Sequence, residues 1–447
     1  MKKRLLSLLI VVLMLAAVGC TATTTTPTTA PAGTTAAPTT AATTTAVPKK
    51  VVLRIGWWGS QVRHDATLAV LDRYTLKTGV TFEPEFFSMA DYLTKLNTLI
   101  AAKDAFDLMQ MGGNFPTYQD NIEYLNDYIK RGVIDVTDIT PAFLGITTFE
   151  GNVIGLSSGT NTIGLAYDPA IFKKANVAVP TDNWTWAEYE KAAIDITKAT
   201  GVMGSSQLGG EFDALTSWIQ QYGGTESFFL PPKRLALNYT GDDKVAEFFN
   251  MKLRMTKAGA YPTPAQMAEI KDIQGDPLVS GKAAMTRISS NQFVAITDAA
   301  KRPLALVAPP RRTATGPLAM SIISSQMFCV YKYSDFKEES AKWISYWVND
   351  IEANLILKGE RGVPIAAKVR AALSIGMSDA QKAIYRLLDV IGKEASLEIV
   401  LNSPVQVEIE DAYKRLSEQV IFEKLTPLAA AAELRKQATE ILSRVKP

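Results

Sequence analysis

The first apolar segment of the chain is a continuous run rather than a periodic pattern. Residues 5–18 are almost all apolar, and they follow the positively charged residues 2–4, Lys-Lys-Arg. A run of about fourteen apolar residues is too short to span a bilayer comfortably. A positive start followed by such a run is typical of a secretory signal peptide. We therefore expect the start of the chain to be an export signal.

The next segment has neither charge nor periodicity. Residues 21–48 consist almost entirely of Thr, Ala and Pro. Such a stretch cannot bury enough apolar surface to fold, so we expect it to be disordered. Enrichment in Thr and Pro favours a semi-extended linker.

From residue 50 onward, short strands alternate with helical patterns. The alternation over 51–55 predicts a strand that ends at Gly56, and apolar residues at helical spacing begin at Ala66. Further strands are expected at 80–86 and 106–111, with a helix between them at 91–102. Strand, helix, strand, helix, strand is the order of an α/β fold with a parallel sheet.

The rest of the chain repeats this mixture with more helix. Thr185 and Glu188 have the spacing of a capping box, so we expect Trp186 to pack on its own helix start. Trp343 and Trp347 share the apolar face of a core helix predicted at 336–349. Other strands are expected at 235–239, 281–286 and 302–309, and other helices at 212–222, 242–257, 352–358 and much of 378–446.

The length and charge of the chain indicate how many lobes to expect and which partners to exclude. A chain of 447 residues is too long for one hydrophobic core, so two lobes are expected. The formal net charge is +2, and without residues 2–4 the count is 44 Lys+Arg against 45 Asp+Glu, or −1. No basic patch emerges, so we expect no nucleic-acid partner.

The chain has two cysteines, Cys20 and Cys329. Because Cys20 ends the leader, the mature chain cannot form an intramolecular disulfide. Cys329 lies in the apolar run 327–331 and is expected to be a small buried hydrophobic residue. One histidine and one such cysteine do not form a metal-binding constellation, so we expect no metal and no cofactor.

Two tryptophans, Trp57 and Trp58, come directly after the first predicted strand. Ligands of open α/β sheets bind at the carboxyl ends of the strands. An indole offers a flat apolar face and one N–H donor, which suits the apolar face of a sugar ring. A core tryptophan pair at a domain seam is the alternative. We expect Trp57 to pack inward and Trp58 to face a cleft.

The end of the leader, Ala17-Val18-Gly19-Cys20, resembles a bacterial lipobox, in which the cysteine becomes the lipidated first residue. Ala17 stands where Leu is usual. The resemblance implies that residues 1–20 are a lipoprotein signal peptide ending in the lipidated Cys20, and that 21–48 are a tether to the membrane. An ordinary signal peptide with cleavage nearby is the alternative.

Six segments in a fixed order carry a second resemblance. They are WWG with Arg63-His64, DLMQM at 107–111, GTNTIGLAYDPAIFKKANV at 159–177, WTWAEYEKA at 184–192, GKAAM with SNQF in 281–293, and ERGVP at 360–364. Together they resemble the extracellular solute-binding lipoproteins of carbohydrate ABC transporters, the group related to maltose-binding protein. The resemblance covers about residues 50–447.

This resemblance implies the periplasmic-binding-protein fold, in which two α/β lobes are joined by hinge strands and hold a sugar between them. The expected N-lobe comprises 49–158 plus 329–370, and the expected C-lobe comprises 159–328 plus 371–447. Crossings are expected near 157–163, 322–329 and 365–375. The resemblance also implies a lipid-anchored monomer on the extracellular or periplasmic face of the membrane, with a carbohydrate ligand and ABC permease subunits as partners.

The candidate ligand-binding residues are polar or aromatic side chains near the predicted strand ends and crossings. They are Trp58, Ser60, Arg63, Asn114, Asn161, Trp218, Asn291 and Gln292. Sugars are bound by aromatic faces and by planar polar groups that make paired hydrogen bonds. Arg63 suits this role because its fork can serve two hydroxyls or a uronic carboxylate, and a surface ion pair is its alternative.

The other candidates have alternatives of their own. Asn161 would lack polar partners between glycine-rich strands unless it meets a ligand. Asn291 is equally a turn residue, and Trp218 is nearly as well explained as a core residue. Relatives in the resembled family often carry an acidic residue directly after the MQM segment, where this chain has Gly112. That departure shifts the expected polar recognition to Asn114.

We interpret the chain as a binding protein rather than an enzyme. A glycosidase needs a pair of carboxyl groups, and no such pair stands at the predicted strand ends. Two rival functions stay open: a secreted glycan-active enzyme, and the same fold used as a sensor or as a receptor for a peptide or polyamine. Arg361 is expected to form a structural ion pair near a hinge rather than to bind ligand.

Overall fold

The computed structural model of this chain describes residues 50–208, 210–223, 227–231, 234–270, 272–395, 399 and 401–445. Within these limits, Lys50–Pro447 form one structural unit. The predicted signal peptide, Cys20 and the predicted tether lie outside the described residues. None of the helices in the described part of the chain combines the length and the apolar composition that a bilayer crossing requires.

The first sheet is built on parallel strands from the start of the folded chain. Its order is β2-β1-β3-β14-β4, with β1 parallel to β2 and β3, and with β14 antiparallel to β3, β4 and β7. The strands are β1 (Val52–Trp58), β2 (Thr81–Phe87), β3 (Leu108–Met111), β4 (Ile122–Glu123), β7 (Leu156–Asn161) and β14 (Ile323–Tyr331). The helices packed on this sheet or on one another are α1 (Gln61–Thr78), α2 (Met89–Ala101), α11 (Lys337–Asn349), α12 (Ile351–Leu357) and α13 (Ala367–Leu373).

Strand β1 extends farther than its alternation predicts. Gly56 to Trp58 continue the pairing with β2 in unbroken register, so the strand does not end at Gly56. A Cβ on Gly56 would lie 2.9 Å from Cγ of Phe106 and closer still to two other ring carbons. Glycine is therefore needed here for close packing and not for a turn. Helix α1 starts at Gln61 rather than Ala66.

The second sheet has the order β13-β8-β12-β9. Strand β8 (Ile163–Tyr167) pairs antiparallel with β12 (Ala283–Ser289) and β13 (Ala305–Val307), and β9 (Met203–Ser205) pairs in parallel with β12. The helices of this half are α5 (Pro169–Ala175), α6 (Trp186–Thr200), α7 (Glu211–Gln220), α8 (Asp243–Lys257), α10 (Phe293–Ala300), α14 (Asp379–Ile391), α15 (Gln406–Ile421) and α16 (Pro427–Ser443).

Short elements fill the connections. They are the pairs β5 (Thr148–Phe149) with β6 (Asn152–Val153) and β10 (Ser227–Phe229) with β11 (Leu237–Asn238), the helices α3 (Asn126–Lys130), α4 (Pro141–Gly145) and α9 (Pro264–Glu269), and the 3-10 helices η1 (Phe115–Asn121) and η2 (Ser290–Gln292).

Several predicted packing roles are confirmed. Trp343 and Trp347 are buried in the core, and Cys329 is fully buried. Both hydrogen bonds of the capping box between Thr185 and Glu188 form at the start of α6. These roles depend on local spacing, which is why the sequence alone is enough to assign them.

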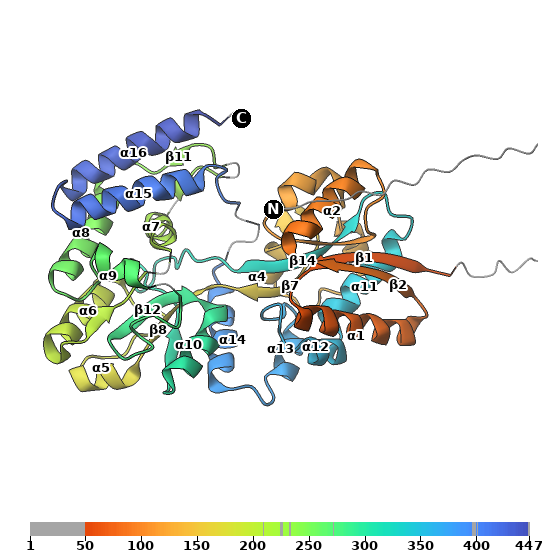
Figure 1. Ribbon diagram of the computed structural model, residues 1–447, viewed down its shortest axis with the longest axis horizontal. Helices are drawn as coiled ribbons and strands as arrows, with labels where there is room; N and C mark the ends of the chain where they lie inside the picture. The colour runs from red at the N-terminus through yellow and green to blue at the C-terminus, as the bar shows by residue number, and fades with distance from the viewer. Residues whose placement is uncertain are drawn as a thin grey trace, which may run out of the picture. The chain divides into compact units, whose positions relative to one another are not determined.

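Strands β7 and β14 connect the two sheets as a two-stranded antiparallel ribbon, which we call the hinge ribbon (Figure 1). Strand β7 ends at Asn161 and β8 begins at Ile163, so the chain passes from the first sheet to the second at Thr162. Strand β14 runs back to the first sheet. A third passage, residues 374–378, leads from α13, which packs on α12, to α14, which packs on β13.

Candidate functional site

Two cavities open on the hinge ribbon, and successive residues of β14 divide between them. Ser324 and Met327 line one cavity, whereas Ser325 and Gln326 line the other. The first is bordered by α7 and is called the α7 cavity, with a volume of about 420 Å³. The second is bordered by α14 and is called the α14 cavity, with a volume of about 380 Å³.

The α7 cavity lies at the carboxyl end of β3, the edge at which open α/β sheets bind ligands. Gly112, Gly113 and Phe115 come from the segment after β3, and the hinge residues 319–324 join them. The other half of the molecule contributes hydrogen-bonding and charged side chains: Asp213, Thr216, Ser217 and Gln220 on α7, with Arg234, Arg287, Asn402 and Gln406. Apolar surface with a few polar groups is typical of a small-molecule site.

The two adjacent tryptophans point in different directions. Trp57 is fully buried in the core, as predicted. Trp58 is only partly buried, and its ring centroid lies 5.2 Å from that of Tyr92. A Cβ on Gly112 would lie 3.8 Å from the edge of the Trp58 ring. The Trp58 indole therefore stands beside the wall of the α7 cavity.

Asn114 has a structural contact as well as a free donor. Its Oδ1 accepts a hydrogen bond from the backbone N–H of Gly112 at 2.9 Å, which fixes the turn after β3. Its Nδ2 is buried and has no hydrogen-bond partner among the described residues. Because residue 112 is glycine, it places no side chain of its own between Asn114 and the Trp58 ring.

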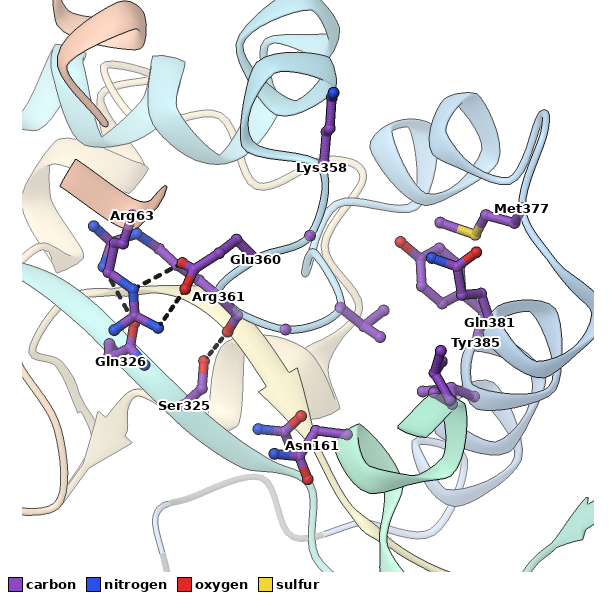
Figure 2. A pocket seen from close by; sticks show the side chains of 16 residues that line it. Arg63, Asn161, Ser325, Gln326, Lys358, Glu360, Arg361, Met377, Gln381 and Tyr385 are labelled. Carbon is purple, nitrogen blue, oxygen red and sulfur yellow. Dashed lines mark hydrogen bonds and ion pairs between the residues drawn. The ribbon is translucent and has the colours of Figure 1, made fainter. Parts of the chain in front are cut away.

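The α14 cavity brings together three of the predicted ligand-binding residues, Arg63, Asn161 and Asn291 (Figure 2). They come from α1, the hinge ribbon and η2. The Arg63 fork is already occupied, because Nε and Nη2 donate to the two carboxylate oxygens of Glu360 at 2.7 and 3.0 Å. The ion pair that was the alternative for Arg63 is thus present, and a ligand would have to compete with Glu360 for this guanidinium.

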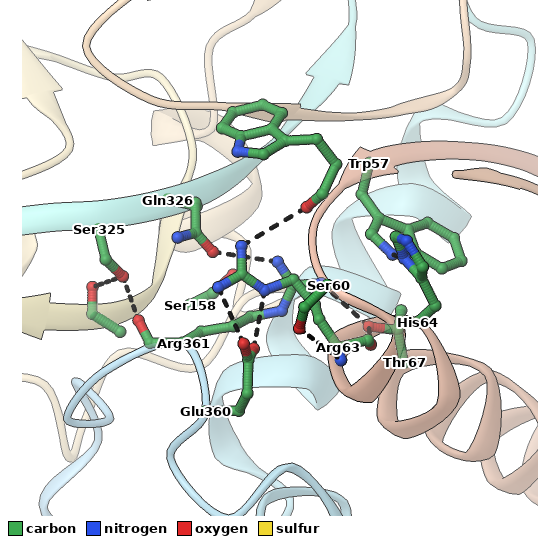
Figure 3. Close-up of polar contacts among 12 residues, drawn as sticks. Trp57, Ser60, Arg63, His64, Thr67, Ser158, Ser325, Gln326, Glu360 and Arg361 are labelled. Carbon is green, nitrogen blue, oxygen red and sulfur yellow. Dashed lines mark hydrogen bonds and ion pairs between the residues drawn. The ribbon is translucent and has the colours of Figure 1, made fainter. Parts of the chain in front are cut away.

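Arg361 follows Glu360 in the loop after α12 (Figure 3). It is a buried cation with an exposed fraction of 3 %. Its guanidinium carbon lies 5.5 Å from the ring centroid of Phe328 and 5.4 Å from that of Trp347. The predicted ion pair of Arg361 is wrong, because no carboxylate lies within 4.0 Å of it among the described residues and Glu360 pairs with Arg63. Burial lowers the pKa of Arg361 below its ordinary value.

Neutral side chains accept hydrogen bonds from the two terminal nitrogens of Arg361 instead, whereas its Nε is buried without a hydrogen-bond partner among the described residues. Nη2 donates to Oγ1 of Thr67 at 2.9 Å, and Nη1 donates to the amide oxygens of Gln326 at 3.1 Å and of Gln110. Gln110 in turn donates to the backbone oxygen of Trp58 at 3.1 Å. Arg361 thereby links α1, β14 and β3 to the end of β1.

A family model described as bacterial extracellular solute-binding protein matches residues 69–382. The chain belongs to this family. The family predicted from the six sequence segments is therefore confirmed, and the protein is an extracellular solute-binding protein.

Solved structures with the same fold cover 88% of this solute-binding protein and 99% of their own chains. An extracellular solute-binding protein family 1 from Alicyclobacillus acidocaldarius has a TM-score of 0.79 at 24% identity. A periplasmic oligogalacturonide binding protein from Yersinia enterocolitica has a TM-score of 0.73 at 20% identity. An ABC substrate-binding protein from Listeria monocytogenes in complex with cycloalternan has a TM-score of 0.64 at 20% identity. The predicted two-lobe α/β fold is confirmed.

Three predicted residues of the solute-binding protein have structural roles. Ser60 caps α1 by accepting the backbone N–H of Arg63 at 3.4 Å. Gln292 accepts the backbone N–H of Ser289 at 3.3 Å and closes a capping box. Trp218 is 5 % exposed, and its Nε1 donates to the backbone oxygen of Lys244 at 2.9 Å. The stacking role predicted for Trp218 is wrong, because its ring packs in the core with Trp186.

The polar residues on α7 were missed in the sequence, although a signal for them exists. Asp213, Thr216, Ser217 and Gln220 follow the i, i+3, i+4, i+7 spacing of one helix face. In the predicted helix at 212–222, this spacing assigns one polar face and one apolar face. Asn402 and Gln406 show no comparable pattern, since their place at the α7 cavity depends on tertiary packing.

The buried pair Trp57–His64 predicts a pH dependence of stability. Nε1 of Trp57 donates to Nδ1 of His64 at 3.1 Å, which requires a neutral imidazole. Burial first, and then the charges of Arg361 and Arg63, lower the pKa of His64 from 6.5. The unfolded chain therefore binds a proton before the folded one does, so the contribution is complete above about pH 6.5 and is lost as the pH falls toward the lowered folded-state pKa.

His64 is the only histidine of the chain, which makes this test specific. We expect the free energy of unfolding, measured with urea from about pH 7.5 to about pH 5.5, to fall in the wild type. The fall should be smaller in His64→Gln, which lacks the titrating group. An equal fall in both proteins would contradict the assignment to His64.

Proposed function

We propose that this solute-binding protein captures a carbohydrate in the α7 cavity and delivers it to an ABC permease. The observation that carries the proposal is the position of the cavity at the end of β3, with α7 facing the segment after β3 across the hinge residues. Two of the similar structures are described as an oligogalacturonide binding protein and as a complex with cycloalternan, which supports a saccharide ligand.

The chemistry of the α7 cavity suits a sugar. Ile323 is exposed in this lining and provides apolar surface for the C–H face of a ring, with Phe115, Phe228 and Met320 buried beside the cavity. Gln220 and Gln406 add amide groups that can serve hydroxyls, and Oε1 of Gln406 is buried without a hydrogen-bond partner among the described residues. A ligand hydroxyl would satisfy this acceptor.

The carboxylates around the two cavities favour binding over hydrolysis. Asp213 is the only carboxylate among the described residues of the α7 cavity. Glu360 is the only one in the described lining of the α14 cavity, and it is bound to Arg63. A glycosidase uses two carboxyl groups on opposite sides of the scissile bond. Neither lining supplies such a pair.

Closure of two lobes around the hinge ribbon would complete the site. We infer the lobes to be 49–158 plus 329–370 and 159–328 plus 371–447, joined through the hinge ribbon and through α13. A ligand that contacts both walls of the α7 cavity binds the closed state better than the open one, and this difference in affinity drives closure.

A carbohydrate panel tests the function. The protein without residues 1–20 would be screened by thermal shift against mono- and oligosaccharides, peptides and polyamines, because a ligand that binds only the folded state raises the melting temperature. We expect one class of saccharide to raise it and to remain intact after incubation. A shift with only peptides or polyamines, or release of shorter sugars, would overturn the proposal in favour of a rival function.

Trp58→Ala should weaken saccharide binding by roughly tenfold or more, about 1.4 kcal/mol. The Trp58 ring stands beside Gly112 at the α7 cavity, and a sugar that contacts it would bury apolar surface on both partners. Calorimetric titration with the best saccharide of the panel measures the change. An unchanged affinity in a folded Trp58→Ala protein would place the sugar away from this wall.

We also propose that Cys20 anchors the protein to the membrane. The lipobox-like residues 17–20 and the tether at 21–48 support this proposal. In wild-type cells the protein should enter the detergent phase of a Triton X-114 extraction, whereas Cys20→Ala should stay in the aqueous phase because it lacks the acylated thiol. Equal partitioning of both proteins into the detergent phase would refute the lipid anchor.

A further inference from the structure

The charged residues of the α7 cavity are not balanced. Its described lining contains two arginines, Arg234 and Arg287, and a single carboxylate, that of Asp213. No carboxylate lies within 4.0 Å of Arg234 among the described residues. Arg287 has an exposed fraction of 1 %, so its charge is held inside the wall of the cavity. Among the described lining residues, positive charges therefore exceed negative charges by one.

Arg234 is held in place by contacts with neutral groups. Nη1 donates to the backbone oxygen of Leu401, and the guanidinium carbon lies 4.9 Å from the ring centroid of Phe229. Partial burial lowers the pKa of Arg234, and only the charge of Asp213 opposes this effect. A planar guanidinium in such a position is suited to a second, anionic partner.

Arg287 is fixed just as firmly. Its Nη1 donates to the backbone oxygen of Leu208 at 2.9 Å. Burial lowers the pKa of Arg287 to about 10, with the charge of Asp213 opposing the effect. Asp213 responds in the opposite direction: desolvation raises its pKa, and the nearby Arg287 and Arg234 counteract the rise. The charge of Glu410 adds to the rise in the pKa of Asp213, so these four charged side chains share one electrostatic environment.

We propose that the saccharide recognised by the α7 cavity is anionic, carrying a carboxylate or a phosphate that lies near Arg234. This inference rests on the proposed function. A neutral sugar offers hydroxyls, which are served well by carboxylate acceptors, and Gly112 leaves the wall after β3 without a side chain of that kind. An acidic sugar instead compensates the surplus positive charge in a partly desolvated site, where charge-assisted hydrogen bonds are strong.

The test compares acidic saccharides with their neutral counterparts of the same linkage. Titration calorimetry would compare a diuronate with the matching neutral disaccharide, and a sugar phosphate with the same sugar without phosphate. Each pair would be measured at two salt concentrations. We expect one acidic compound to bind at least tenfold more tightly than its neutral counterpart, and the preference to shrink at high salt because screening weakens the attraction. Comparison of the diuronate pair with the sugar phosphate pair shows whether the cavity recognises a carboxylate or a phosphate.

Three variants of the cavity and one surface control separate the effect of the cavity from the effect of the protein's net charge. Arg234→Gln should reduce the acid-to-neutral affinity ratio about tenfold, and Arg234→Lys, which keeps the charge, should retain most of the ratio. Asp213→Asn should raise the ratio because it removes a repulsive charge. Lys436→Gln, on the exposed face of α16, changes the net charge equally and should leave the ratio unchanged. Melting temperatures would confirm that each variant is folded.

The outcomes distinguish the two proposals. Neutral saccharides that bind as tightly as acidic ones would overturn the anionic ligand and leave carbohydrate capture standing. If Arg234→Gln still bound acidic saccharides more tightly than neutral ones by the wild-type ratio, the α7 cavity would not be the source of this preference. Absence of binding by every saccharide, acidic or neutral, would overturn the carbohydrate function together with this inference.

Discussion

Trp57→Ala is expected to lower the free energy of unfolding by about 3 to 5 kcal/mol, the usual range for a fully buried aromatic side chain. Trp57 has an exposed fraction of 0 % and lies on β1, between the neighbouring strands β2 and β3. Its ring centroid is 5.3 Å from that of Phe86, and its N–H is bonded to His64. Alanine would leave a cavity in the sheet core and a buried imidazole acceptor without its donor.

Trp58→Ala is the matched control for this measurement. The two residues are adjacent on the same strand and face opposite sides of the sheet, but Trp58 is only partly buried. Urea unfolding followed by circular dichroism should show a clearly smaller loss in Trp58→Ala than in Trp57→Ala. A larger loss in Trp58→Ala would mean that the inward and outward positions of the pair had been exchanged, and equal losses would contradict the deeper burial of Trp57.

Those parts of the fold that depend on short-range patterns could be predicted from the sequence. The strand at the start of the folded chain was predicted from its alternation, and in the structure Trp57 and Trp58 continue it, where successive residues point to opposite sides. The six sequence segments identified the family. The end of β1 was misplaced because Gly56 resembles a turn signal, whereas its function is to let the Phe106 ring approach the strand.

The candidate site was harder to predict because its contacts join distant parts of the chain. Arg63 and its partner Glu360 are 297 positions apart, and Arg361 and Gln110 are 251 positions apart. No local spacing indicates that Glu360, rather than a ligand, occupies the Arg63 fork. Likewise, no local spacing in the sequence indicates that Arg234 and Asp213 border one cavity.

The hinge ribbon is joined to the loop after α12 by backbone contacts. Thr160 and Val363 exchange backbone N–H to oxygen hydrogen bonds of 2.9 and 3.1 Å, and Oγ1 of Thr160 donates to the same Val363 oxygen at 2.9 Å. Ser325 on the other strand of the ribbon donates to the backbone oxygens of Gly159 and Arg361. The loop that positions Arg361 is therefore held to both strands at the hinge.

Gly159→Ala should disrupt this junction and lower the free energy of unfolding by about 3 kcal/mol or more, the upper range for overpacking a close contact. A Cβ on Gly159 would lie 2.5 Å from the carbonyl carbon of Arg361 and 2.8 Å from Cα of Gly362, with the Arg361 oxygen closer still. These are backbone atoms, so no side-chain rotation can relieve the overlap. The ribbon and the loop would have to separate, with loss of the hydrogen bonds between Thr160 and Val363.

Gly113→Ala provides the matched glycine control, because a Cβ there would have no atom within 4 Å and the backbone does not have positive φ. We expect urea unfolding to show a large loss for Gly159→Ala and a change within about 0.5 kcal/mol for Gly113→Ala. Gly159→Ala should also weaken saccharide binding at temperatures where it remains folded, since the separated loop no longer holds Arg361 against Gln110 and the end of β1. A Gly159→Ala protein as stable as the Gly113→Ala control would show that the ribbon and the loop are not packed this closely in solution.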